Sequence, residues 1–216
     1  MKTILTLLYG TTKFSYKDVH RIYNSTDGQY NYICLTDKQN AKFLREEIKV
    51  VLLDESLEDC WHKMGLFNID IPGKVLYLDL DVAIQGDLSP VFEHSVTPTI
   101  CKTYWKDFGS EFNSSVMVWE DNQTRYIYDN FKKHDQYYMT KYIGDDRFLY
   151  HENQFKSVFP RGLIYSFLCG VDKDTDVSPR AYQIKPEYPI VLLNGQNEVN
   201  INLRKHYDAL FMHEMG

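Results

Sequence analysis

Short apolar runs alternate with amphipathic segments through the first half of the chain. Four runs are rich in aliphatic residues and bounded by turn residues, which predicts strands. They cover residues 3–9, 30–35, 49–53 and 74–80. Three segments carry apolar residues at helical spacing, which predicts helices. They cover residues 16–23, 40–47 and 57–64. This order of elements predicts an α/β fold with a mostly parallel central sheet flanked by helices.

The second half is less regular but keeps the same two kinds of element. Two further apolar runs predict strands at residues 115–119 and 188–193. Three segments have a helical pattern and cover residues 122–134, 145–151 and 200–212. A polar stretch with several prolines, residues 170–187, predicts a surface loop.

Composition and charge narrow the function classes. The 216 residues include 24 Lys and Arg and 30 Asp and Glu, which gives a net charge of 24 − 30 = −6. A broad basic surface for nucleic acid is therefore not expected. No apolar run is long enough to span a membrane, and the N-terminus does not have the pattern of a signal peptide. The four cysteines form no CxxC pair and are expected to be free thiols of an intracellular, cytoplasmic protein. They are Cys34, Cys60, Cys101 and Cys169.

Two carboxylates, Asp79 and Asp81, end the most apolar of the predicted strands, with Leu80 between them. Side chains two apart on a strand point to the same side, and ligands of open α/β sheets bind at the carboxyl ends of the strands. Two carboxylates that face together repel unless a cation lies between them. Mg²⁺ or Mn²⁺ suits such a pair and keeps open positions for phosphates. The competing interpretation is a strand that ends in a solvated polar turn.

Five segments in the same order resemble GT-A glycosyltransferases, and within them the glycogenin-like group and related viral enzymes. They are residues 60–67 (CWHKMGLF), 74–92 (KVLYLDLDVAIQGDLSPVF), 112–119 (FNSSVMVW), 144–149 (GDDRFL) and 159–166 (FPRGLIYS). The resemblance implies one GT-A domain over residues 1–216, with a nucleotide-binding half at about 1–92 and a sugar and acceptor half at about 93–216. The small size suggests a domain of a longer polypeptide of the chlorella-virus type, placed in the host cytoplasm if viral.

The resemblance also implies a reaction. A hexose or a deoxyhexose would pass from a UDP-sugar to a hydroxyl of a carbohydrate or glycoprotein acceptor, in glycan synthesis on a viral glycoprotein if the chain is viral, with Mn²⁺ or Mg²⁺ on the donor diphosphate. Lys63 would bind a donor phosphate and offset charge on the departing UDP. The residues expected to hold the nucleotide and the donor sugar are Leu8, Tyr9, Gly10, Thr11, Lys63, Asp79, Leu80, Asp81, Asn113, Ser114 and Ser115.

The catalytic candidates are Lys63, Asp145 and Asp146. Asp145 matches the first acid of the family's helix start, where it would contact sugar hydroxyls, stabilise positive charge at the anomeric carbon or act as a base. Alternatively, Asp145 is the N-cap of that helix. Asp146 stands where the family has Gln, and whether the reaction retains or inverts the anomeric centre is left open.

The third metal ligand departs from the family pattern. Asp79 and Asp81 are the first two expected ligands, and Asn194 occupies the place of the family's histidine. His206 and His213 are the alternatives. Two other functions remain: a nucleotide-sugar-binding module without turnover, which would not need both aspartates, and a nucleotidyltransferase. The latter normally has a glycine-rich basic loop after its first strand, whereas this chain has one glycine there.

Overall fold

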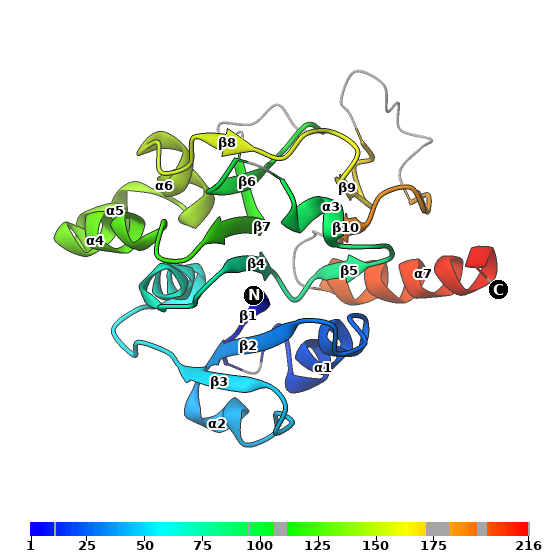
Figure 1. Cartoon of the computed structure of the whole chain (residues 1–216), viewed down its shortest axis with the longest axis horizontal. Coiled ribbons are helices and arrows are strands. Elements are labelled where there is room, and N and C mark those ends of the chain that lie inside the picture. The colour runs from blue at the N-terminus through cyan, green and yellow to red at the C-terminus, as the bar shows by residue number, and fades with distance from the viewer. Residues whose placement is uncertain (11, 95, 106–111, 172–181, 194–197, 216) are drawn as a thin grey trace.

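The computed structural model describes residues 1–10, 12–94, 96–105, 112–171, 182–193 and 198–215. Its main sheet contains the strands β1 (Lys2–Leu8), β2 (Asn31–Thr36), β3 (Lys49–Leu52), β4 (Lys74–Leu78), β6 (Thr99–Lys102), β7 (Phe112–Glu120) and β8 (Ser157–Val158). They lie in the order β3-β2-β1-β4-β7-β6-β8 (Figure 1). The four strands of the first half pair in parallel, while β7 runs antiparallel to both neighbours. The predicted α/β fold with a mostly parallel sheet is confirmed.

A smaller sheet begins where the main sheet ends. It contains β5 (Val82–Ile84), β9 (Ile164–Ser166) and β10 (Ile190–Leu192), in the order β5-β10-β9. The strand predicted at residues 188–193 is therefore shorter than expected and belongs to this second sheet. Since β5 follows β4 after three residues, the chain passes from one sheet to the other at residues 79–81.

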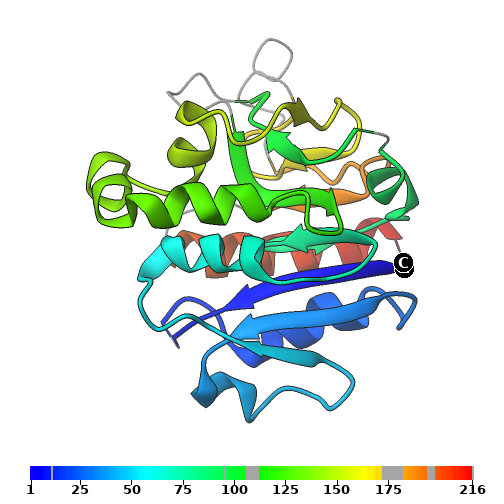
Figure 2. The same cartoon turned by 60° about the vertical axis from the view of Figure 1, so that its left-hand side comes forward.

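Helices cover both faces of the main sheet. They are α1 (Tyr16–Asn24), α2 (Lys38–Ala41), the 3₁₀ helix η1 (Asp59–Asn68), α3 (Ser89–Phe92), α4 (Arg125–Lys133), α5 (Asp135–Lys141), α6 (Asp145–His151) and α7 (Glu198–Met215). Figure 2 shows η1 and α4 side by side in front of the sheet and α7 behind it. Among the described helices, none is long and apolar enough to cross a membrane.

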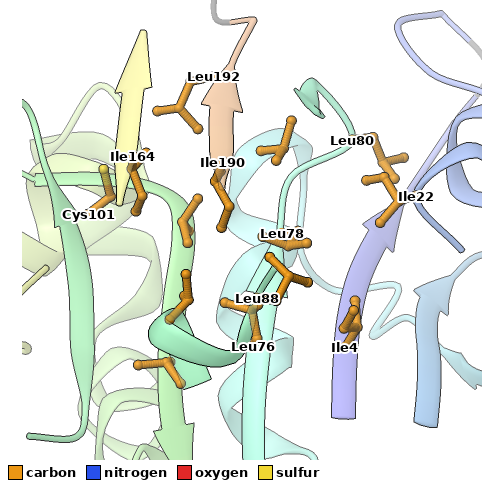
Figure 3. Close-up of a cluster of buried hydrophobic side chains, with 14 of the residues drawn as sticks. Ile4, Ile22, Leu76, Leu78, Leu80, Leu88, Cys101, Ile164, Ile190 and Leu192 are labelled. Atoms are coloured by element: carbon orange, nitrogen blue, oxygen red, sulfur yellow. The ribbon is translucent and has the colours of Figure 1, made fainter. Parts of the chain in front are cut away.

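The alternation of side chains along each strand divides the core into two layers. Ile4 and Leu8 of β1 pack on the side of α1, whereas Leu5 and Leu7 pack on the side of η1, α4 and α6. In the first layer, Ile4 lies beside side chains of the neighbouring strand β4 (Figure 3). A residue at the end of a strand therefore faces either α1 or the group of η1, α4 and α6, depending on its position in this alternation.

Three further predicted elements differ from the structure. In place of the helix expected at residues 40–47, the structure has the short helix α2. It begins earlier because Asp37 is its N-cap and accepts hydrogen bonds from the backbone of Gln39 and Asn40. The helix expected at residues 57–64 is η1, of the 3₁₀ type. Among its buried residues, Trp61, Met64 and Phe67 recur every third position, which is the period of a 3₁₀ helix, and Leu66 is buried as well. The strand expected at residues 74–80 ends at Leu78.

Two smaller predictions concern the cysteines and a loop. All four cysteines are free, as expected. Most of the polar segment at residues 170–187 lies outside the described residues, so the loop there stays a prediction.

Candidate functional site

Asp79 and Asp81 lie in a turn, not in a strand as predicted. The backbone N–H of Val82 donates a hydrogen bond to the carbonyl of Asp79 over 3.2 Å, which closes a four-residue β-turn. The strand still sets the direction of Asp79, because Tyr77 lies two residues earlier on the same side. The Tyr77 hydroxyl donates to Oδ1 of Asp79 over 2.5 Å. Asp79 therefore faces the layer of η1.

Lys63 of η1 is the cation at the centre of the site. Its Nζ donates to Oδ2 of Asp79 over 2.9 Å and to the hydroxyl of Ser114 over 2.7 Å, and it lies 3.6 Å from Oδ2 of Asp145. Burial alone would lower the pKa of Lys63, but the carboxylates of Asp145 and Asp79 outweigh it and raise that pKa well above its usual value. Lys63 thus stays charged while 11% of its side chain is exposed.

Asp145 and Asp146 begin α6 and lie beside Lys63 and β7. Gly144 is the N-cap of α6, so the alternative interpretation of Asp145 as that cap is wrong. Oδ2 of Asp145 is buried without a hydrogen-bond partner among the described residues, apart from the charge of Lys63. Asp146 accepts a hydrogen bond from the Ser114 backbone over 2.7 Å. Burial, and then the charge of Asp145, raises the pKa of Asp146 to about 6.

Asp81 has the features of a cation ligand. Its Oδ1 is buried without a hydrogen-bond partner among the described residues, and its Oδ2 lies 3.7 Å from Nζ of Lys13. Burial, and then the nearby Asp79 carboxylate, raises the pKa of Asp81 to about 6. Both oxygens of Asp79 already accept hydrogen bonds, but a carboxylate has further lone pairs. The pair fits a hard divalent cation with oxygen ligands.

The described residues do not identify the third metal ligand. Asn194 lies outside the described residues, and so does the side chain of His213. His206 is exposed, and its ring packs near Phe167 and Tyr182. Within the described part of the chain, no three His, Cys, Asp or Glu side chains gather as a metal cluster. The third ligand therefore stays a prediction, with Asn194 as the first candidate and His206 and His213 as the alternatives.

A cavity of about 680 Å³ opens at the carboxyl ends of β1, β2 and β3. The ring of Tyr9 lines it, 4.9 Å from that of His62. Gly10 lines it too, but its N–H donates to Asp37 over 3.0 Å and its carbonyl accepts from Asn40 over 2.8 Å. The backbone of Gly10 is thus engaged within the protein. Thr11 lies outside the described residues.

The other expected ligand-binding residues lie near the site but are mostly covered. Leu8 and Leu80 are buried in the core. Ser114 and Ser115 are buried next to Lys63 and Asp79. Asn113 is partly exposed and accepts a hydrogen bond from the Ser115 backbone over 3.1 Å.

Sequence reasoning missed three residues of this site. They are Lys13, which faces Asp81, Tyr77, which donates to Asp79, and Arg21, which binds the backbone of the turn. Only Tyr77 had a signal in the sequence, because it stands two positions before Asp79 on the same strand face.

Several solved glycosyltransferases share this fold. The galactosyltransferase LgtC, solved with donor and acceptor sugar analogues, aligns over 96% of this chain and 96% of its own, with a TM-score of 0.62 and 13% identity. GlyE of Streptococcus pneumoniae aligns over 99% of this chain and 63% of its own, with a TM-score of 0.61 and 14% identity. A glycosyltransferase involved in glycosylation of the major capsid of PBCV-1 aligns over 96% and 98%, with a TM-score of 0.60 and 11% identity.

These matches define the class of fold. This chain has the GT-A fold that these glycosyltransferases share, as its sequence motifs implied. No protein-family model and no curated protein matches the sequence.

Proposed function

We propose that this protein is a metal-dependent glycosyltransferase that moves a hexose or a deoxyhexose from a UDP-sugar to a hydroxyl of a carbohydrate or glycoprotein acceptor. One observation carries the proposal: within a GT-A fold, the charge of Lys63 lies between Asp79 and Asp145 at the carboxyl edge of the sheet. A protein that needed only a stable fold would gain little from several partly desolvated charges gathered there.

Asp79 and Asp81 are the residues that would hold Mn²⁺ or Mg²⁺, with Asn194 as the proposed third ligand. A divalent ion bound there supplies positive charge to the donor diphosphate as a Lewis acid. Lys63 lies beside Asp79 and adds a second positive charge for the departing UDP. Oδ2 of Asp145 has no hydrogen-bond partner among the described residues, so it can accept a hydrogen bond from a donor-sugar hydroxyl or face positive charge at the anomeric carbon.

The cavity beside Tyr9 supports a site for the nucleobase. It lies at the same sheet edge as the carboxylates, and its walls combine the rings of Tyr9 and His62 with polar groups. A planar base can stack on such rings, while the diphosphate extends toward Asp79 and Asp81. This arrangement supports a nucleotide sugar as the donor.

A thermal-unfolding panel with UDP, GDP, CMP and dTDP sugars, with and without Mn²⁺, tests the donor site. A ligand at about 100 times its Kd adds about 2.7 kcal/mol to the stability of the native state. We expect stabilisation by UDP-sugars that requires Mn²⁺, is lost in Asp81→Asn and is kept in Asp87→Asn. Asp87 is a matched control because it lies on an exposed loop of the same connection. Stabilisation that is indifferent to Mn²⁺ and to Asp81 would overturn the metal-diphosphate site.

Turnover separates the transferase from its two alternatives. We expect slow release of UDP from the preferred UDP-sugar in the presence of Mn²⁺ and faster release with an acceptor. Tight binding with no release under any condition would favour a nucleotide-sugar-binding module. Formation of a UDP-sugar from UTP and a sugar phosphate would instead identify a nucleotidyltransferase.

A further inference from the structure

Arg21 of α1 binds the main chain on both sides of Asp81. Its Nη1 donates to the carbonyl of Val82 over 2.9 Å, and its Nη2 donates to the carbonyl of Leu80 over 2.6 Å. Among the described residues, these carbonyls are the only hydrogen-bond partners of the guanidinium, whose Nε is buried without one. Among the described residues, all hydrogen bonds that the Arg21 side chain donates therefore go to this turn.

Neighbouring groups hold the backbone of this turn, whereas the side chain of Asp81 has the ion pair with Lys13 and an Oδ1 without a hydrogen-bond partner among the described residues. The ends of the turn are joined by the Val82 to Asp79 hydrogen bond, and the carbonyl of Asp81 accepts from the N–H of Leu193 over 2.8 Å. The side chain of Leu80 is buried in the same core cluster as Ile22, and Figure 3 shows the two side by side. α1 thus holds Leu80 through its side chain and its carbonyl together.

The chemistry of the guanidinium suits this task. A guanidinium presents several N–H donors in a rigid planar fork, so one side chain can bind two carbonyls two residues apart, which a single ammonium does less well. Burial, and then the charge of Arg204, lowers the pKa of Arg21 to about 10, so Arg21 remains charged at neutral pH.

Helix α1 is itself fixed in place. A capping box formed by Ser15 and Asp18 begins the helix, and Val19 and Ile22 are buried against the sheet. The side chain of Arg21 therefore projects from a rigid element.

We infer that Arg21 is a positioning residue for the Asp79–Val82 turn, and that it holds the Asp81 carboxylate in the orientation that binds a divalent cation together with Asp79. This inference rests on the proposed function, because it assumes that Asp79 and Asp81 take the cation. The competing role is a purely structural one, in which Arg21 only attaches α1 to the sheet.

Cation affinity is the first test. Calorimetric titration with Mn²⁺ in the presence of UDP would compare wild type with Arg21→Met, Arg21→Lys and Arg45→Gln. Loss of groups that orient metal ligands typically weakens metal affinity about 10- to 100-fold. We expect a loss in that range for Arg21→Met, a smaller loss for Arg21→Lys and no change for Arg45→Gln. Arg45 is the matched control because its Nη1 donates to the exposed side chain of Asn24 and not to the turn.

A second measurement needs no metal. Amide hydrogen exchange of the metal-free protein reports on Val82 and Leu193, whose N–H groups bind the turn. We expect Arg21→Lys and Arg21→Met to speed exchange at these two amides while strand β1 and helix α1 stay protected. If exchange in α1 and β1 speeds up as much as at Val82 and Leu193, Arg21 has a structural role and the inference is overturned. Either variant can be used for this test, as long as it folds.

The outcomes separate this inference from the proposed function. If wild type binds Mn²⁺ with UDP and both Arg21 variants bind it equally well, the positioning role is wrong while the proposed function stands. If wild type does not bind Mn²⁺ with UDP, the proposed function fails and this inference fails with it.

Discussion

The Nζ atom of Lys63 lies 2.9 Å from Oδ2 of Asp79, although one residue belongs to η1 and the other to the turn after β4. The same ammonium lies 3.6 Å from Asp145 at the start of α6. Three segments that are distant in the sequence are thus joined by one cation. Because that cation is largely buried, its loss would leave two desolvated carboxylates without the positive charge that offsets them.

We therefore expect Lys63→Met to destabilise the metal-free protein by about 3 kcal/mol, because breaking a buried ion pair by removing one partner costs about 3–5 kcal/mol and this pair keeps some exposure. The control is Lys132→Met. Lys132 and its partner Asp135 are both more exposed than the Lys63–Asp79 pair, so the expected cost is about 0–1 kcal/mol. Urea unfolding measures both. In the double variant Lys63→Met with Asp145→Asn, part of the loss should return, since one repelling carboxylate is gone. Equal effects of the two lysine variants would contradict this account.

A second prediction concerns pH. The pKa of Asp146 is raised from an ordinary 3.8 to about 6, first by burial and then by the charge of Asp145. Between these values the folded protein keeps a proton that the unfolded chain has lost. The stability that Asp146 contributes is therefore full below about pH 4 and falls as the pH rises through about 6.

Asp146→Asn cannot ionise, and its amide oxygen can still accept the Ser114 hydrogen bond. We expect this variant to gain roughly 2–3 kcal/mol over wild type as the pH rises from 4 to 7, since each pKa unit corresponds to about 1.4 kcal/mol. Urea unfolding at several pH values measures the difference, with the exposed Asp129→Asn as control. A difference between Asp146→Asn and wild type that does not change with pH would show that Asp146 titrates normally.

Local patterns predicted the parts of this fold that depend on a single segment. The parallel strands β1 to β4 are long enough for their apolar pattern to be read, and the position of Asp79 follows from the strand that leads to it. Strands β5 and β9 have three residues each, which is too short for an alternating pattern to be recognised in the sequence. They are stabilised by pairing with β10.

The missed site residues depend on contacts between segments. In the sequence, Arg21 is a charged residue on an amphipathic helix, a pattern that usually marks a solvated face. Its partners are main-chain carbonyls 59 and 61 positions away, and carbonyls have no sequence signature. Lys13 is similar, because its approach to Asp81 depends on the path of the loop after β1. The role of Lys63 came from the family resemblance, since spacing alone cannot show which face of η1 meets the sheet.

The cavity beside Tyr9 gives a third prediction. If the base of UDP stacks on Tyr9, Tyr9→Ala should weaken UDP binding about 5- to 150-fold, because stacking of a base on an aromatic side chain contributes about 1–3 kcal/mol. Tyr9→Phe keeps the ring and should bind UDP nearly as well as wild type. Calorimetric titration with UDP and Mn²⁺ measures both. If Tyr9→Ala binds UDP as tightly as Tyr9→Phe, the base lies elsewhere.

The last prediction concerns Lys13, whose Nζ lies 3.7 Å from Oδ2 of Asp81 and whose side chain is 47% exposed. In the metal-free protein this ammonium competes with a divalent cation for Asp81, so Lys13→Ala should bind Mn²⁺ alone somewhat more tightly. Once a cation is bound there, Lys13 is free to face the donor diphosphate. Lys13→Ala should then bind UDP with Mn²⁺ more weakly, by about fivefold for an exposed pair worth about 1 kcal/mol.

Opposite signs in the two titrations distinguish this role from general electrostatics. Lys17→Ala, which removes an exposed charge from the same region, should change both affinities in the same direction and only slightly. The effect of Lys13→Ala on UDP should also shrink at high salt, because a half-exposed charge is screened. If Lys13→Ala weakens Mn²⁺ and UDP alike, Lys13 does not compete with the cation and acts only through the net charge of the loop.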